Sequence, residues 1–235
     1  MSDIVIVSAA RTPVGSFNGS FSNITAADLG SIVIKEVLNR AKIRGEDVSE
    51  VIMGQVLTAS CGQNPARQAS IKAGVPQEIT AFTINQVCGS GLRSVALGLQ
   101  SIINNEAEII VAGGQENMTQ APHCFHLRQA GIMGDTEMID SMIKDGIWDI
   151  FNGYHMGVTA ENVAEKWQIT RDEQDEMALN SQHKAEEAQK NGKFQKEIVS
   201  VSKQFFWKHI FLTFNKFPTF AILNKMFSSK TFVRN

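Results

Sequence analysis

The sequence contains three cysteines, five prolines and a single tyrosine, and it has no long uninterrupted apolar run. Its cysteines, Cys61, Cys88 and Cys124, show no paired spacing, which excludes a disulfide scaffold and favours a reduced, cytoplasmic environment. No stretch of about 18 residues is both uncharged and strongly apolar, so we expect neither a transmembrane helix nor a membrane partner. The N-terminus lacks a basic segment followed by a long apolar one, so we expect no secretory signal.

Acidic residues are absent from the end of the chain. All 24 of them precede position 201, whereas residues 201–235 contain six basic residues, eight of the 14 phenylalanines and no glycine. This change in composition predicts a separate basic, aromatic tail over 201–235. Two explanations remain open: a shift of reading frame or a gene split near residue 200, or a functional segment that lies on a membrane surface. The formal net charge of −2 gives no reason to expect a nucleic-acid partner.

Apolar patterning predicts an α/β fold. Strands alternate with helices in the first half of the chain, which is typical of βαβ units and a mainly parallel sheet. Residues 117–155 are irregular, and a highly charged helix follows later. We expect short strands at 3–8 (buried), 50–56, 81–86 and 108–112, and helices at 26–42, from Pro65 to Gly74, at 92–103 and at 171–191.

Short polar side chains mark where several helices begin. Thr25 with Asp28 three residues later, and Thr170 with Glu173, have the spacing of a capping box. Asn64 precedes a proline, which is favoured at the first position of a helix. Thr159 is also predicted to be an N-cap.

The segment NQVCGSGLRS places Cys88 between an apolar strand and an apolar helical pattern. Glycines after the cysteine allow a sharp turn and close approach by a substrate. Free N–H groups at the start of the helix favour a negatively charged thiolate, which is the nucleophilic form of cysteine. Buried cysteines are also common packing residues, so the pattern alone leaves a nucleophile and a structural residue both open.

Four segments together resemble the thiolase family of acyltransferases, and in particular its biosynthetic acetyl-CoA acetyltransferases. They are VSAARTPVGSFNGS at 7–20, NQVCGSGLRSV at 85–95, VAGGQENMTQAPH at 111–123 and GYHMGVTAENVAEKW at 153–167. The resemblance covers about residues 1–200. It implies a thiolase-like layered αβα half with a mainly parallel sheet, followed by an α-rich loop domain.

The resemblance also implies domain boundaries and partners. Residues 1–117 would form the N-terminal core half, 118–200 a partial loop domain and 201–235 the divergent tail. Family members form dimers or tetramers, so a homo-oligomer is expected.

By resemblance, Cys88 is the catalytic nucleophile that accepts an acyl group from acyl-CoA, in a reversible conversion of two acetyl-CoA molecules into acetoacetyl-CoA and CoA. His155 and Met156 match positions that line the pantetheine tunnel, and Ile147 lies where the family has an apolar residue near CoA. The CoA thioester is the substrate, so no cofactor is expected. We expect no metal site either, because the two histidines that flank Cys124 make too small a ligand set.

The sequence departs from the family pattern in its second half. It has no NEAF-like segment with an asparagine, no GHP segment with a histidine and no CxGxG segment with a second cysteine. We therefore expect the chain to lack the C-terminal catalytic half and to expose a large apolar face. A separately encoded C-terminal half is one possible partner. The alternatives are a catalytically inactive truncated remnant, or an interaction protein that retains residual contact with CoA.

Overall fold

The structure is a computed structural model that describes residues 4–126, 128 and 133–202. The predicted tail over 201–235 lies almost entirely outside the described residues. The predicted boundaries between core half, loop domain and tail stay predictions.

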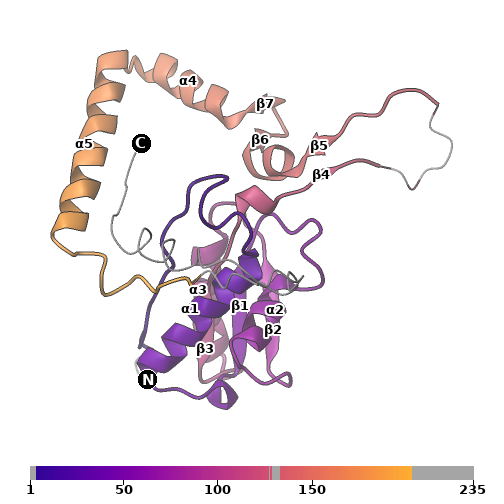
Figure 1. The fold of residues 1–235 in the computed structure, drawn as a ribbon, viewed down its shortest axis with the longest axis vertical. Coiled ribbons are helices and arrows are strands. Elements are labelled where there is room, and N and C mark those ends of the chain that lie inside the picture. Colours follow the sequence, from indigo (N-terminus) through magenta and orange to yellow (C-terminus); the bar gives the residue numbers. More distant parts are fainter. Residues whose placement is uncertain (1–3, 127, 129–132, 203–235) are drawn as a thin grey trace, which may run out of the picture. The chain divides into compact units, whose positions relative to one another are not determined.

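A three-stranded parallel sheet forms the centre of the fold (Figure 1). Its strands are β1 (Glu50–Gly54), β2 (Thr80–Ile84) and β3 (Ile110–Gly114), in the order β2-β1-β3. Both neighbours run parallel to β1, so all three carboxyl ends lie at one edge of the sheet. The prediction of an α/β fold with a parallel sheet is confirmed, with strand ends within two residues of those expected.

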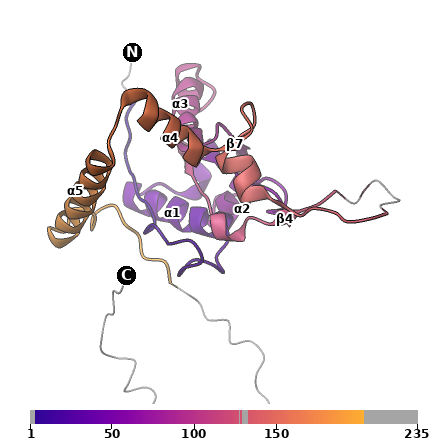
Figure 2. The same ribbon diagram turned by 90° about the horizontal axis from the view of Figure 1, so that it is seen from above.

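Helices cover both faces of this sheet (Figure 2). The helices α1 (Ala26–Ala41) and α2 (Pro65–Lys72) pack on one face, and α3 (Ser90–Ile103) packs on the other. Successive side chains of a strand point to opposite faces, so each strand serves both layers. The α1/α2 layer contains the main apolar core, formed by Ala27, Ile34, Leu38, Val48, Val51, Met53, Ala66, Ala69, Val75 and Val111.

Side-chain caps fix the starts of α1 and α2 as predicted. The Asp28 N–H donates to Oγ1 of Thr25 at 3.1 Å, and the Arg67 N–H donates to Oδ1 of Asn64 at 3.2 Å. Each contact satisfies one of the N–H groups that a first helical turn leaves unpaired. Pro65 occupies the first position of α2, where its missing N–H costs nothing.

The predicted buried strand at 3–8 is wrong over the residues that the structure describes. Residues 4–10 have no strand structure, and Val5, Ile6 and Val7 are 68%, 81% and 68% exposed. The chain first pairs at Arg11, whose N–H donates to the Glu197 carbonyl at 2.8 Å. The apolar run has strand-forming residues, but no described strand hydrogen-bonds to it, and a strand requires such a partner.

The chain after β3 forms small hairpins and two helices. In this region β4 (His123–Cys124) pairs with β5 (Ile139–Asp140), and β6 (Trp148–Asp149) pairs with β7 (Tyr154–His155). Single turns of helix lie here at η2 (Met118–Gln120) and η3 (Ile143–Ile147), and another, η1 (Gly45–Asp47), precedes β1. The longer helices are α4 (Met156–Trp167) and α5 (Arg171–Lys190).

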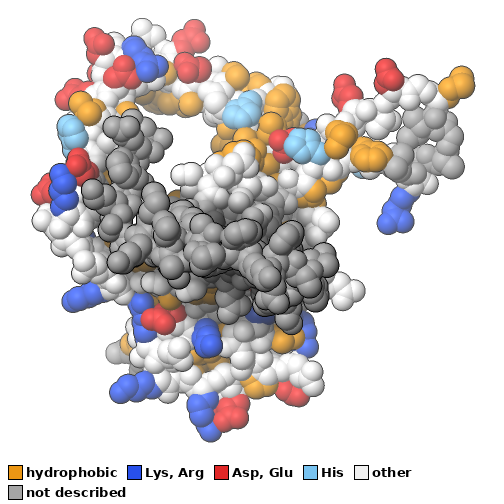
Figure 3. Space-filling model, in the orientation of Figure 1, with side chains coloured by type: hydrophobic (Ala, Val, Ile, Leu, Met, Phe, Trp, Pro, Cys, Tyr) orange, Lys and Arg blue, Asp and Glu red, His pale blue; other side chains and the backbone are white. Residues whose placement is uncertain are grey.

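The caps of these helices confirm one prediction and correct another. Thr170 and Glu173 form the predicted capping box at the start of α5. Thr159 is not an N-cap, because α4 begins three residues earlier and His155 caps it instead. The imidazole of His155 provides the acceptor that the sequence pattern assigned to the threonine. Charged side chains of both signs cover α5 (Figure 3), which has no buried residue.

None of the helices in the described ranges combines the length and the apolar character that crossing a bilayer requires.

Candidate active site

Cys88 lies in a tight turn between the end of β2 and the start of α3. Its side chain is exposed and its thiol is free. The preceding residue, Val87, has a φ of 47°, in the left-handed region. This conformation is unusual for a β-branched residue and costs about 1–3 kcal/mol, so the surrounding structure must enforce it.

Hydrogen bonds from two short side chains hold this turn. The Val87 N–H donates to Oδ1 of Asn85 at 2.8 Å. The Ser90 hydroxyl accepts from the Gln86 N–H at 2.8 Å and donates to the Val87 carbonyl at 2.6 Å. Both peptide groups that flank the strained residue are therefore fixed.

Glycines allow the start of α3 to touch the carboxyl ends of the strands. A Cβ atom on Gly54 would lie 2.5 Å from the carbonyl carbon of Ser90, and one on Gly114 would lie 3.4 Å from Cα of Gly91. No larger residue fits at Gly54 without moving the helix. The contact places Cys88 at the carboxyl edge of the parallel sheet, which is where α/β proteins usually bind ligands.

The first turn of α3 lacks a side-chain cap. Gly89 is its N-cap residue and makes no side-chain hydrogen bond. The other α-helices of the described chain are each capped by a side chain, from Thr25, Asn64, His155 or Thr170. The Gly89 and Ser90 N–H groups donate to the carbonyls of Gln86 and Val87, both at 3.1 Å. The positive end of this uncapped helix still favours negative charge beside it, such as a thiolate or a developing oxyanion.

The residues predicted to contact CoA lie together at one hairpin. Ile147 is half-buried and directly precedes β6, whose Trp148 pairs with His155 in β7. Met156 follows as the first residue of α4 and is 46% exposed. Nδ1 of the exposed His155 accepts from the Gly157 N–H at 2.9 Å, so Nε2 is the ring nitrogen that this cap leaves for another contact. The structure thus groups these three residues and presents Cys88 separately, at the sheet edge.

A half-buried carboxylate after the end of β3 was not predicted from the sequence. Glu116 accepts from the Val56 N–H at 2.8 Å and from the Leu57 N–H at 3.3 Å. Burial raises the pKa of Glu116 above its ordinary value of 4.5, although these two hydrogen bonds partly oppose the shift. The residue holds the loop that follows β1 against the end of β3. Its position directly after Gly114-Gln115 at a strand end is the only signal that the sequence offers.

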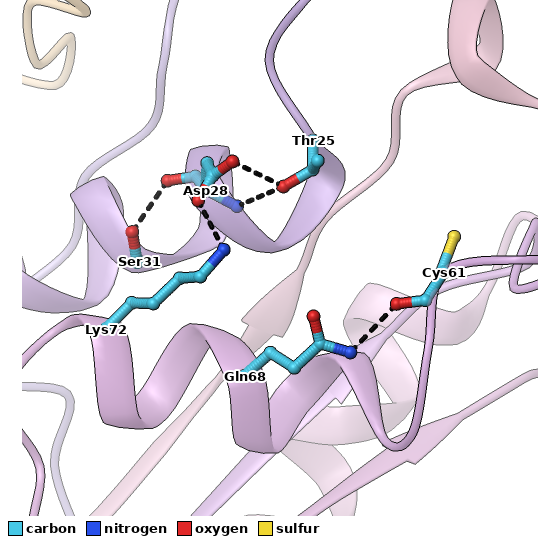
Figure 4. Close-up of polar contacts among 6 residues, drawn as sticks. All are labelled: Thr25, Asp28, Ser31, Cys61, Gln68 and Lys72. Carbon is cyan, nitrogen blue, oxygen red and sulfur yellow. Dashed lines mark hydrogen bonds and ion pairs between the residues drawn. The ribbon is translucent and has the colours of Figure 1, made fainter.

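A hollow of about 220 Å³ lies between α1, α2 and the loop after β1. Figure 4 shows polar residues beside it, several of which are already paired within the protein. The Lys72 ammonium binds Asp28 at 2.6 Å, and the Gln68 amide donates to the Cys61 carbonyl at 2.8 Å. The thiol of Cys61 lies 3.4 Å from the Leu57 carbonyl. These contacts place Cys61 in the packing of the loop after β1.

A larger, apolar hollow of about 540 Å³ lies between residues 4–10 and β3. Side chains of α1 and α3 complete its walls, among them Val33, Val37, Leu99 and Ile102. Cys88 lines neither this hollow nor the smaller one.

Within the described ranges, no group of three or more His, Cys, Asp or Glu side chains is arranged to hold a metal ion. His123 lies 3.7 Å from Asp140, across the β4–β5 pair.

Comparison with known proteins identifies the fold. The family model described as "Thiolase, N-terminal domain" matches residues 4–218. The chain belongs to the thiolase family. The sheet, the helices on both of its faces and the turn around Cys88 all lie within the matched residues.

Curated relatives of this thiolase-family chain share its sequence closely. It is 65% identical over 196 residues to an acetyl-CoA acetyltransferase of Rhizobium meliloti (strain 1021), which covers 83% of this chain and 50% of the relative. It is 56% identical over 198 residues to the cytosolic acetyl-CoA acetyltransferase of Rattus norvegicus, which covers 84% of this chain and 50% of that protein. The chain thus spans about half the length of the curated relatives it matches.

Proposed function

We propose that this thiolase-family chain carries the nucleophilic half of an acetyl-CoA acetyltransferase and that Cys88 accepts the acetyl group. The observation that supports this most directly is an exposed thiol on a strained turn, beside an uncapped helix start at the carboxyl edge of the sheet. The names of the curated relatives support the same activity.

In the first step, the Cys88 thiolate attacks the carbonyl carbon of acetyl-CoA. The new carbon–sulfur bond forms first and gives a tetrahedral intermediate, in which the former carbonyl oxygen carries negative charge. When this intermediate collapses, the bond to the CoA sulfur breaks, and CoA leaves as a thiolate that takes up a proton. The N–H of Cys88 and the N–H groups of α3 that follow Ser90 are proposed to stabilise the negative oxygen of the intermediate, because no side chain caps this helix, whereas the Gly89 and Ser90 N–H groups already donate to carbonyls of the turn.

The hairpin with Ile147, His155 and Met156 is proposed to contact the pantetheine arm of CoA. Its support is the exposure of His155 and Met156 together with their position at the start of α4. In this proposal CoA thioesters are substrates, and no separate cofactor takes part.

The second step needs groups that this sequence does not supply. A second acetyl-CoA must lose a proton from its methyl carbon before the resulting enolate attacks the acetyl-cysteine. The sequence has no GHP segment and no CxGxG segment. We therefore assign the proton transfers to the half of the relatives' length that this sequence does not span, and we propose that the assembly is a homo-oligomer. A cytoplasmic location is part of this proposal and is supported by the rat relative, which is named a cytosolic acetyl-CoA acetyltransferase.

Acetyl transfer to Cys88 tests the proposal directly. The chain is incubated with acetyl-CoA at about pH 9, where a thiol ionises without help from a base, since a cysteine ordinarily titrates near 8.5. Intact mass and peptide mapping should show one acetyl group on Cys88. Cys88→Ala should abolish it, while Cys61→Ala and Cys124→Ala should retain it.

Equal acetylation of all three cysteines, or none on a folded chain, would contradict the proposal. A thiolysis assay with acetoacetyl-CoA and CoA then separates the two half-reactions. We expect cleavage only after a C-terminal half is added, and cleavage by the chain alone would refute the assignment of the bases to that half. If Cys88 is not acetylated and acetoacetyl-CoA is not cleaved even after a C-terminal half is added, the alternative of a catalytically inactive remnant is favoured.

A further inference from the structure

We propose that Asn85 and Ser90 are positioning residues that hold Val87 at positive φ and so keep the Cys88 thiol in its reactive orientation. The inference rests on the proposed acetyl transfer to Cys88 and extends it to residues that need not touch the substrate. It begins with the φ of 47° at Val87, which a β-branched residue adopts only under constraint.

The constraint comes from both sides of Val87. On its N-terminal side, the Val87 N–H donates to Asn85 Oδ1 at 2.8 Å. On its C-terminal side, the Val87 carbonyl accepts from the Ser90 hydroxyl at 2.6 Å and from the Ser90 N–H at 3.1 Å. Rotation toward an ordinary negative φ would have to break at least one of these hydrogen bonds.

Ser90, which binds the Val87 carbonyl, cannot move away, because it is packed tightly against the sheet. It is only 4% exposed, and its Cβ would lie 2.6 Å from a Cβ placed on Gly54. One turn later, the hydroxyl of Ser94 lies 2.9 Å from the Gly113 carbonyl. The rigid carboxyl edge of β1 and β3 thereby sets the turn that carries Cys88.

Relaxation of Val87 would turn the chain about its N–Cα bond and redirect the next residue. Nucleophilic attack depends on the alignment of the sulfur with the thioester, and small displacements reduce rates strongly. The two polar side chains therefore act on catalysis through the backbone.

The test uses Asn85→Ala, because Asn85 is exposed and its loss leaves the core intact. Two rates are measured at about pH 9: acetyl transfer from acetyl-CoA to Cys88, and alkylation of Cys88 by iodoacetamide. We expect Asn85→Ala to slow acetyl transfer by about tenfold. Asn85→Asp keeps the acceptor oxygen and should stay close to wild type.

The decisive variant is Val87→Gly, because glycine adopts positive φ freely. In the Val87→Gly background, Asn85→Ala and Ser90→Ala should lose much less activity than they do beside valine. Ser94→Ala is the matched control: it removes another buried hydroxyl of α3, and glycine at position 87 should not rescue it.

Equal losses in both backgrounds would show a merely structural role and overturn the proposal, as would wild-type rates for Asn85→Ala. Alkylation keeps this test separate from the proposed function, because it requires a well-placed thiol but no thioester chemistry. If acetyl transfer fails even in the wild type, the same pattern of loss and rescue in alkylation still supports the positioning role, and its absence refutes it.

Discussion

Small side chains around Cys88 let backbone approach backbone. Gly54 lets the start of α3 touch the end of β1, and Gly91 and Gly114 meet between α3 and β3. The short hydroxyl of Ser94 reaches the Gly113 carbonyl at 2.9 Å. A turn that is tied to a sheet in this way has few alternative positions, which is a requirement for a nucleophile that must meet its substrate repeatedly in one geometry.

The raised pKa of Glu116 predicts how the stability of the fold changes with pH. Burial raises its pKa in the folded chain, so between the ordinary value of 4.5 and the raised value the folded state binds more protons than the unfolded state. Its contribution to the free energy of unfolding is then fully present below pH 4.5 and is lost as the pH rises through the folded pKa. Urea unfolding of the wild type and of Glu116→Gln from pH 4 to pH 7 measures this difference.

The wild type should lose stability relative to Glu116→Gln as the pH rises across that range. The glutamine does not titrate and keeps one acceptor oxygen for the Val56 and Leu57 N–H groups. A difference that stays constant with pH, or that grows in favour of the wild type, would contradict the assignment.

Some residues of the site were visible in the sequence and others were not. The turn at Cys88 was predictable because an apolar strand, two glycines and an apolar helical face follow in order. The φ of Val87 was not, since local preference opposes it and only the packed neighbours enforce it. Glu116 was missed because its partners, Val56 and Leu57, lie about 60 positions away in the sequence.

At the scale of elements, local signals located the helices well and one strand poorly. Caps such as Thr25 and Thr170 act within one turn, so their pattern is complete in the sequence. A strand depends on a partner elsewhere, and residues 4–8 have the right side chains without one. His155 shows a further limit: an imidazole replaces the usual hydroxyl as a cap, and the N-cap lies four residues earlier than the predicted Thr159.

The N-cap Thr25 predicts how much the start of α1 contributes to the stability of the fold. Its hydroxyl accepts from the Asp28 N–H and donates to Oδ2 of Asp28 at 2.6 Å. Thr25→Ala should lower the free energy of unfolding by about 1 kcal/mol, since α1 then starts with one more unpaired N–H. Thr25→Ser keeps the hydroxyl and should lose only a small part of this. Urea titration at neutral pH measures both variants, and equal losses would mean that the methyl group matters rather than the cap.

At the scale of the whole molecule, the most informative feature is the apolar surface that remains exposed. One side of α3 carries Leu92, Val95, Leu99 and Ile103, which are between 39% and 78% exposed and recur at helical spacing. The apolar hollow beside β3 adds to this surface. Exposed apolar surface of this kind marks a contact with another protein segment, in agreement with a chain that spans half the length of its relatives.

We expect a C-terminal half, such as that of the Rhizobium meliloti relative, to cover this side of α3. Its addition should reduce the fluorescence of a dye that binds exposed apolar surface and should give a stable complex in size-exclusion chromatography. Leu92→Lys should weaken that complex, because burying an unpaired ammonium is costly. Met177→Lys on α5 is the matched control, since Met177 is 76% exposed and Leu92 is 78% exposed. If the two variants weaken the complex equally, or if neither does, the C-terminal half binds elsewhere and the exposed side of α3 needs another explanation.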